Sequence, residues 1–331
     1  MLLSHVTHYF RAVGLQLWRE SPSEQRIPLG WDMEVGEACG YLDQVGNFLR
    51  DAEAKELAAI PTPTSVYLFG CEPFFQPDNV EEVLACAQRN QMASEIWTTG
   101  AWVENQVGVR KMLARLAGKL YALSICTSRE LLDRVGIDRI ELLIAEARGI
   151  HLGVSIRCAI GPLSPFPREL LALETLNADA GFLHVIPLSS LTEGTRSPDR
   201  QPGYLLDEPP LRRRCAGLLD FLIAPGGDVY PCARGIGVPA LRLGSLNNES
   251  VLDIIRRTLA NSALRKLRAE GPYYLYKAVK GSKARNLLYP GYVDCCHFHH
   301  HALSDPELAQ IVSRTEEKLD SQGGDSVEPR E

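Results

Sequence analysis

The sequence predicts an α/β protein, in which a partial (β/α)6 barrel precedes a small α+β domain with a β-hairpin. From residue 65 to residue 187, short apolar runs alternate with amphipathic segments, the pattern of parallel strands joined by helices. With a further strand expected near residues 27–33, the strand–helix units are fewer than the eight of a closed barrel. At 218–232, two apolar runs flank Pro-Gly-Gly-Asp, which is a hairpin signal.

The predicted barrel strands are apolar throughout rather than alternating, as expected for parallel strands that are covered on both faces. Pairs of residues with capping-box spacing predict where the helices between them begin. The strands are expected at 65–70, 95–100, 120–126, 151–158 and 181–187. The helix starts are expected at Asp78 with Glu81, Thr127 with Glu130, Asp138 with Glu141, and Pro167, whose helix runs to about Leu176.

Changes in composition divide the chain into segments. A stretch rich in Pro, Ser, Gly and charge predicts a linker between the barrel and the small domain. A long helix is expected from Ser250, with Asp253 at capping-box spacing, to Glu270, and Pro306 helps to start a last helix. The expected segments are an N-terminal helical segment (1–26), the barrel (27–190), the linker (191–210), the small domain (211–303), and a C-terminal helix with a disordered tail (304–331).

Composition and charge exclude several classes of protein. The chain has 331 residues and a net charge of -6, which argues against nucleic acid as a partner. No apolar stretch approaches the roughly 18 residues of a membrane span, and no cleavable signal pattern is present at the start. We therefore expect a cytoplasmic protein with no membrane segment.

Cysteines are placed unevenly along the chain. Cys215 and Cys232 flank the predicted hairpin, and Cys295 and Cys296 stand together before a run of histidines. In a reducing compartment such cysteines indicate metal or redox chemistry rather than disulfides. Four thiolates suffice for an iron–sulfur cluster or a tetrahedral zinc ion, and His297 and His299 are alternative ligands. We expect Cys71, Cys86, Cys126 and Cys158, which lie in apolar runs, to be structural.

The order of these features resembles a known family. The spacing Cys-x11-Gly-x4-Cys, the stretch "LGSLNNESVLDIIRR" (243–257) and the distal cysteines are similar to the SPASM or twitch extension of radical S-adenosylmethionine enzymes. The resemblance implies that Cys215, Cys232, Cys295 and Cys296 bind one auxiliary [4Fe–4S] cluster. The short final run of cysteines favours the one-cluster twitch arrangement.

The predicted barrel carries the same resemblance, which implies a TIM-like fold. "YLFGCEPFFQPD" (67–78) is similar to the family's Gly-Gly-Glu-Pro motif, whose backbone and glutamate hold the amino group of S-adenosylmethionine. Gly70, Glu72 and Pro73 match that motif, whereas Cys71 replaces its second glycine. "IWTTG" (96–100) resembles the third-strand motif, and Ser124 occupies the fourth-strand position that often meets the ribose.

The motif that binds the catalytic cluster is missing. The family uses Cys-x3-Cys-x2-Cys after its first strand, and the corresponding stretch "GWDMEVGEACGYLDQ" (30–44) keeps only Cys39. Asp32 and Gly36 stand at the other two positions. One thiolate cannot hold a cubane, and a carboxylate is a hard ligand for this soft cluster. The sequence therefore predicts a protein that cannot generate the 5'-deoxyadenosyl radical, with Cys39 as a remnant.

A basic region follows the predicted hairpin. Residues 256–285 carry nine Lys or Arg residues against Glu270, a local net charge of +8, and the aromatic stretch "PYYLY" (272–276) interrupts them. Such a region could bind an acidic peptide, a nucleic acid or a partner protein. The alternative is an ordinary solvated helix face.

Three functions are compatible with these features. The first is an iron–sulfur protein that lacks the catalytic cluster and acts as an electron-transfer or accessory partner in peptide or cofactor maturation. The second is an active radical S-adenosylmethionine enzyme with atypical cluster ligands, such as Cys39 and Cys71. The third is a structural binding module with zinc at the Cys/His site. The stretch at 30–44 favours the first, so whether the protein is an enzyme depends on that stretch.

Overall fold

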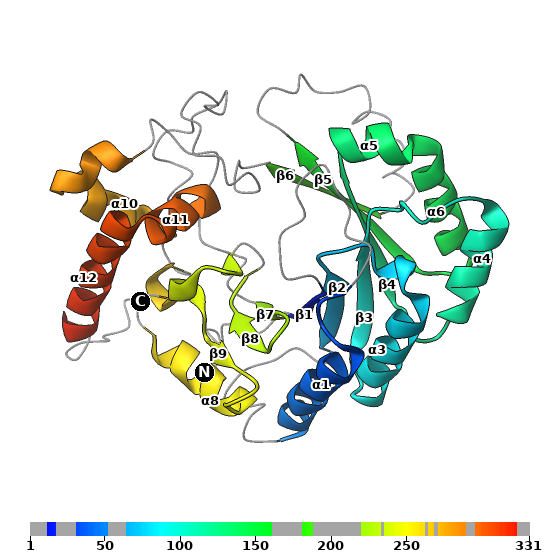
Figure 1. Ribbon diagram of the computed structural model, residues 1–331, viewed down its shortest axis with the longest axis horizontal. Coiled ribbons are helices and arrows are strands. Elements are labelled where there is room, and N and C mark those ends of the chain that lie inside the picture. Colours follow the sequence, from blue (N-terminus) through cyan, green and yellow to red (C-terminus); the bar gives the residue numbers. More distant parts are fainter. Residues whose placement is uncertain are drawn as a thin grey trace, which may run out of the picture.

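The computed structural model describes residues 12–17, 31–51, 64–160, 181–187, 220–232, 235–261, 264–267, 271–288 and 295–322. Within them one nine-stranded sheet has the order β6-β5-β4-β3-β2-β1-β7-β8-β9 (Figure 1). The strands are β1 (Ala12–Gln16), β2 (Ser65–Phe69), β3 (Ala93–Thr98), β4 (Ala122–Ser128), β5 (Gly153–Ile160), β6 (Gly181–Pro187), β7 (Asp220–Ile223), β8 (Asp228–Tyr230) and β9 (Gly244–Ser245).

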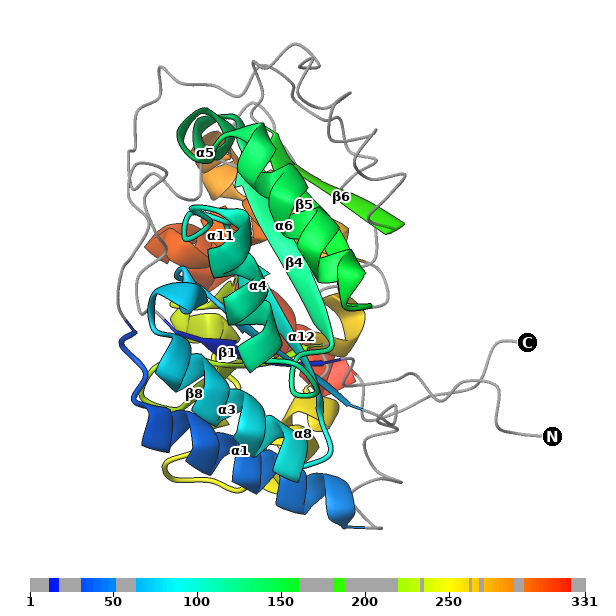
Figure 2. The same cartoon turned by 90° about the vertical axis from the view of Figure 1, so that its right-hand side faces the viewer.

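The first six strands form an open parallel sheet, as predicted for a partial TIM-like barrel. Helices cover one face of this sheet, and Figure 2 shows four of them, α1, α3, α4 and α6, in one layer. The helices after the strands are α1 (Val35–Arg50), α3 (Pro77–Arg89), α4 (Gln106–Arg115), α5 (Arg129–Val135) and α6 (Ile137–Gly149), and a 3-10 turn η1 (Pro73–Phe75) follows β2. None of the described helices is long and apolar enough to cross a membrane.

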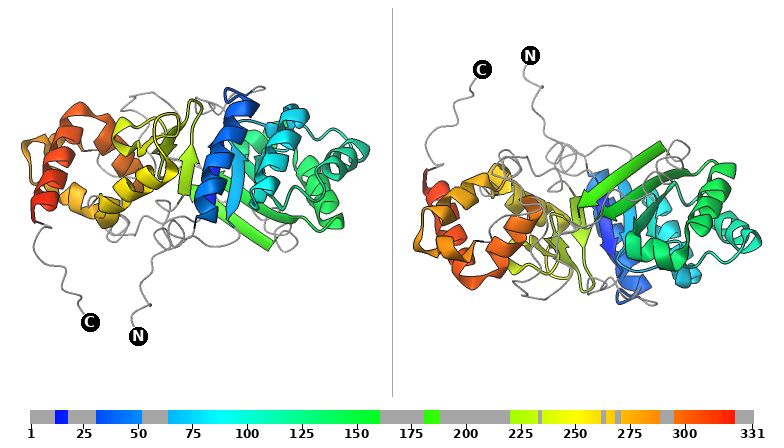
Figure 3. Two further views of the ribbon diagram at one scale, coloured as in Figure 1. Left: turned by 90° about the horizontal axis from the view of Figure 1, so that it is seen from below. Right: turned by 90° about the horizontal axis from the view of Figure 1, so that it is seen from above.

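The predicted hairpin extends the barrel sheet. Its first strand, β7, pairs in parallel with β1, and β8 and β9 then continue the sheet in antiparallel pairing. Figure 3 shows this C-terminal unit beside the barrel. Its helical elements are α8 (Val251–Ala260), α10 (Tyr273–Lys280), α11 (Cys295–Ser304), α12 (Pro306–Gln322) and the 3-10 turns η5 (Pro239–Leu241) and η6 (Lys283–Leu287).

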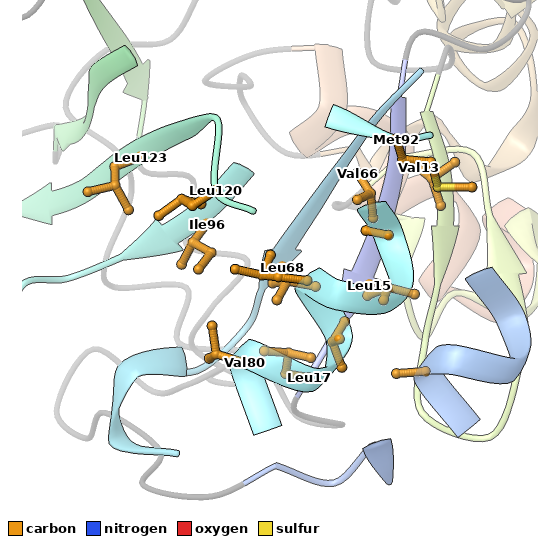
Figure 4. Close-up of a cluster of buried hydrophobic side chains, with 14 of the residues drawn as sticks. Val13, Leu15, Leu17, Val66, Leu68, Val80, Met92, Ile96, Leu120 and Leu123 are labelled. Atoms are coloured by element: carbon orange, nitrogen blue, oxygen red, sulfur yellow. The ribbon is translucent and has the colours of Figure 1, made fainter. Parts of the chain in front are cut away.

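The main hydrophobic core lies between the sheet and its helix layer, and we call it the helix-side core. Leu15 of β1, Leu68 of β2, Ile96 of β3 and Leu123 of β4 are all 0% exposed and belong to one cluster with Val80 of α3 (Figure 4). These residues alternate along each strand with side chains on the opposite face, as the period of a strand requires. Each such side chain stabilises the fold by about 1.5–3 kcal/mol.

The structure corrects the start of the barrel. The first described strand is β1 at Ala12–Gln16, so the expected helical segment over 1–26 is wrong there. A strand near 27–33 is not found at residues 31–33, and residues 27–30 lie outside the described residues. The run that forms β1, Ala-Val-Gly-Leu-Gln, is five residues long and buried throughout. Periodicity cannot distinguish so short an apolar run from part of a buried helix.

The helices are confirmed where they are described, but three of the predicted caps are wrong. The residues at the N-caps of α3, α5 and α6 are Gln76, Ser128 and Gly136. Asp78 and Asp138 instead lie in the first turn, where their charge favours the helix dipole. Ser250 does cap α8, whose end at Ala260 makes it shorter than predicted. The expected helix at 167–176 and the linker at 191–210 lie outside the described residues.

Substitution of Gly14 tests how closely β1 packs against its neighbouring strands. A Cβ at this position would collide with Cδ2 of Leu222 and would lie 2.8 Å from Cζ of Tyr67. We expect Gly14→Ala to lower the free energy of unfolding by about 2 kcal/mol, measured by urea denaturation, because overpacking forces a central strand apart. In Gly40→Ala the new Cβ meets nothing within 4 Å, so this helical control should be neutral or stabilising. Equal effects would contradict the packing around β1.

Candidate functional site

The inner face of the sheet, opposite the helix layer, carries polar and aromatic side chains. Tyr67 of β2 and Trp97 of β3 pack in a second cluster with Leu222 of β7, separate from the helix-side core. The register of the parallel strands sets Trp97 opposite Ser124 of β4. Strand β3 alternates between partly exposed and buried positions, so the expectation of wholly apolar strands is wrong for this face.

An aromatic and cationic stack crosses this inner face. The Cζ atom of Arg157, on β5, lies 4.1 Å from the centroid of the Trp97 ring. The Trp97 and Tyr67 rings are stacked, with centroids 4.7 Å apart and planes 7° apart. The Tyr67 hydroxyl donates a hydrogen bond to Oδ2 of Asp220 on β7, at 2.9 Å. The stack therefore connects β5 to the first strand of the hairpin.

A polar network lies beside this stack. Glu95 Oε1 accepts from Trp97 Nε1 at 2.9 Å, and it lies 3.6 Å from Nη2 of Arg157. Arg157 Nε donates to Ser124 Oγ at 3.0 Å, and Ser124 also bonds to Glu95 and to Ser155. The Arg157 and Glu95 side chains are 22% and 24% exposed, so a ligand can reach both. Opposite charges beside an aromatic face suit a zwitterionic ligand with an aromatic or cationic group.

Glu72, which the resemblance identifies as a ligand-binding residue, is 1% exposed at the end of β2. Its carboxylate accepts from the hydroxyls of Thr98 (2.8 Å) and Thr99 (2.6 Å), from the Thr99 amide (2.8 Å) and from the Phe74 amide (3.4 Å). Burial raises the pKa of Glu72, although the bonds from Thr99 and Thr98 act to lower it. This carboxylate joins the ends of β2 and β3, and contact with a ligand would require one of these bonds to break.

Gly70, Cys71 and Pro73 flank Glu72 at the end of β2. Gly70 has a φ of 103°, which favours glycine. The Cys71 side chain is 7% exposed and belongs to the helix-side core, where burial raises the pKa of its thiol. Replacement of the motif's second glycine by Cys71 therefore puts no side chain on the inner face. Pro73 begins the turn η1.

The connection between the first strand and the first helix contains no cysteine. Because β1 ends at Gln16 and α1 begins at Val35, this connection covers residues 17–34, and none of these is Cys. Cys39 lies inside α1, where its carbonyl accepts a hydrogen bond from the Cys86 thiol of α3 at 3.5 Å. Burial raises the pKa of both thiols, that of Cys86 to about 12. The structure thus places Cys39 between two helices rather than at the strand ends.

The predicted Cys/His site is described only in part. Cys232 follows β8 and is partly exposed, while Cys295 and Cys296 begin α11. Leu303 of α11 packs against the cluster that contains Tyr230, so α11 lies against the hairpin unit. His299 is 8% exposed. Cys215 and the side chains of Cys295, Cys296 and His297 lie outside the described residues, so this ligand set stays a prediction.

Sequence reasoning found Ser124 but missed the residues beside it on the inner face, Glu95, Trp97 and Arg157. A signal was present, because "EIW" in β3 and "SIR" in β5 place a polar or aromatic residue at every second position. Among the described side chains, no group of three His, Cys, Asp or Glu residues could hold a metal ion.

No family model and no curated protein matches the sequence. Solved structures do resemble it, among them anSMEcpe, an anaerobic sulfatase-maturating enzyme, with bound AdoMet. That likeness has a TM-score of 0.53 and 12% identity over 95% of this chain and 99% of the other. For native anSMEcpe with AdoMet and the Kp18Cys peptide, the TM-score is 0.55 with 12% identity over 92% and 99%. This chain therefore has the fold of a radical S-adenosylmethionine enzyme of this type over most of its length.

Proposed function

We propose that this protein binds S-adenosylmethionine on the inner face of its sheet without cleaving it, and serves as an accessory or electron-transfer partner in peptide or cofactor maturation. The observation that carries the proposal is the absence of cysteine from residues 17–34, between β1 and α1. The resemblance implies that an active enzyme binds its catalytic cluster there through three thiolates. Without that cluster, no electron reaches the sulfonium through a bound iron.

The inner face fits the charges of S-adenosylmethionine. Arg157 and Ser124 can bind a carboxylate, and Glu95 can bind an amino group. The Trp97 ring, which stacks between Arg157 and Tyr67, holds the Arg157 guanidinium in place for such contact. Gly70, which matches the family's motif for this ligand, lies at the end of β2 with a φ of 103°. Solved structures with this fold hold AdoMet, and two of them also hold a peptide, which supports a role in peptide maturation.

Isothermal titration of the full-length protein with S-adenosylmethionine tests this site. We expect Arg157→Gln to weaken binding about tenfold, because a charge-assisted hydrogen bond contributes about 1.5–3 kcal/mol. Arg139→Gln, on the exposed side of α6, should bind as the parent does. The proposal fails if the parent protein does not bind, or if the Arg157 variant binds with unchanged affinity.

The auxiliary site completes the proposal. Cys215, Cys232, Cys295 and Cys296 would hold one [4Fe–4S] cluster, which lets the protein pass electrons. The packing of α11 against the hairpin unit supports this ligand set. Zinc is the alternative, with His297 or His299, which follow Cys295 and Cys296 in the sequence of α11, among its ligands. Iron and zinc analysis distinguishes the two.

An active enzyme with Cys39 and Cys71 as cluster ligands has less support. Cys39 contacts the Cys86 thiol between α1 and α3, and Cys71 is buried in the helix-side core. Neither side chain is part of the inner-face cluster that carries Trp97 and Tyr67. A cluster bound by these two thiols would have to form inside the packed helix layer.

A further inference from the structure

A basic surface lies outside the inner face, on α10 and the turn η6. Its cations are Lys277, Lys280, Lys283 and Arg285, all of them exposed. Residues 271–288 contain no Asp or Glu, so this segment has a charge of +4. Because the whole chain has a net charge of -6, the remainder carries -10. We call these four residues, with Tyr273 and Tyr276, the α10 surface.

Two tyrosines hold two of these ammonium groups in place. The Nζ atom of Lys277 lies 5.1 Å from the centroid of the Tyr273 ring, and that of Lys280 lies 5.4 Å from the Tyr276 ring. The two rings are 6.3 Å apart, with planes 25° apart. Residues four apart share one side of a helix, so both pairs present their charge in the same direction. Cation–π contact restricts these long side chains before a partner binds.

The helix beneath the α10 surface is firmly anchored. Leu275 and Val279 are 0% exposed, and the Tyr276 ring meets the edge of Phe298, on α11, with centroids 5.6 Å apart. Cys295 and Cys296 begin α11, one turn before Phe298. A partner that binds the α10 surface would therefore lie near the start of the helix that carries two predicted cluster ligands.

We propose that the α10 surface binds an acidic peptide segment of a partner protein. The charges are complementary, and eight residues of helix are about 12 Å long, which matches a short segment. A nucleic acid would need a longer positive surface to contact its backbone. A membrane surface would need large exposed apolar side chains, and those of the described residues, Phe75, Val107, Tyr121 and Ile150, all lie outside α10 and η6.

This inference names the class of partner for the accessory role proposed above, but its test does not depend on S-adenosylmethionine. Fluorescence polarisation of the full-length protein would use a labelled peptide with Glu at every second position, and the same peptide with Gln as its control. We expect Lys277→Gln with Lys283→Gln to weaken binding of the Glu peptide about fivefold, since each exposed ion pair contributes a fraction of a kcal/mol. Added salt should weaken binding by the parent protein as well.

The matched control removes two charges elsewhere. Lys111→Gln with Arg139→Gln, on exposed positions of α4 and α6, should leave the affinity unchanged, and near-ultraviolet circular dichroism should show both double variants folded. Equal losses in the two variants, or no binding by the parent, would overturn the inference. So would a single-stranded RNA that binds more tightly and displaces the peptide. Peptide binding that persists when S-adenosylmethionine binding is absent would defeat only the proposal for the inner face.

Discussion

Replacing Glu72 with alanine is expected to lower the free energy of unfolding by about 3 kcal/mol, measured by urea denaturation. The substitution removes the acceptor for the hydroxyls of Thr98 and Thr99 and for two backbone amides, at a site that is 1% exposed. A buried donor without an acceptor has lost its hydrogen bonds to water and forms no hydrogen bond within the protein, which destabilises the folded state. The loss of stability should be large because the Glu72 carboxylate links the ends of β2 and β3.

Glu81→Ala is the matched control, since it removes a carboxylate that pairs with Arg115 and Lys119 on the surface. Solvent already screens these pairs, so the loss should be much smaller. If the two alanine variants lose the same stability, Glu72 does not join the strands as the hydrogen bonds indicate.

Glu72 also predicts how the stability of the protein depends on pH. Burial raises the pKa of Glu72 in the folded chain, so the folded chain keeps a proton that the unfolded chain has already released. The extra stability from this bound proton is fully present below the pKa that Glu72 has in the unfolded chain. It is lost as the pH rises through the higher pKa that Glu72 has in the folded chain. Glu72→Gln does not titrate, so its unfolding free energy should fall less with pH over that window. If the unfolding free energies of the parent and of the Glu72→Gln variant change equally with pH, the pKa of Glu72 is not raised in the folded chain.

Replacing Cys232 with serine is expected to remove the metal of the auxiliary site. A thiolate is a strong ligand for an iron–sulfur cluster and a hydroxyl is a weak one, so iron should fall from about four atoms per chain to less than about one. Iron, zinc and acid-labile sulfide would be measured after anaerobic reconstitution. If zinc is the bound metal, zinc rather than iron should be lost.

Cys39→Ser provides the control for this ligand assignment. Cys39 lies between α1 and α3 beside Cys86, so its replacement should leave the iron content unchanged. Full iron in the Cys232 variant would remove Cys232 from the ligand set. Loss of iron in the Cys39 variant would instead favour an enzyme with atypical ligands.

Much of the barrel could be predicted from the sequence. The predicted strand at 181–187 coincides with β6, and the Pro-Gly-Gly-Asp turn connects β7 to β8 as expected. Strands β2 to β5 lie within about two residues of their predicted positions, since each is a short apolar run between amphipathic segments. The first strand was missed because its run is only five residues long, and periodicity cannot distinguish so short an apolar run from part of a buried helix. Its position at Ala12–Gln16 moves the first connection to residues 17–34, which lack cysteine, and the missing catalytic cluster stays a prediction.

The inner face was harder to predict than the fold. Contact between Trp97 and Arg157 requires that β3, β4 and β5 be neighbours in the right register, which no local pattern specifies. The side chain of Glu72 was expected to bind a ligand, yet its acceptor positions meet Thr98 and Thr99. A motif can place a carboxylate at a strand end, but the neighbouring strand decides what that carboxylate contacts.

The most direct test of the central claim is to reconstitute the protein anaerobically with iron and sulfide, add a strong reductant and S-adenosylmethionine, and measure iron, the electron-paramagnetic-resonance spectrum and 5'-deoxyadenosine together. A single auxiliary cluster predicts about four irons per chain, a spectrum unchanged by S-adenosylmethionine, and no 5'-deoxyadenosine. About eight irons per chain, a spectrum that S-adenosylmethionine perturbs, or formation of 5'-deoxyadenosine would show that the chain still builds a catalytic cluster.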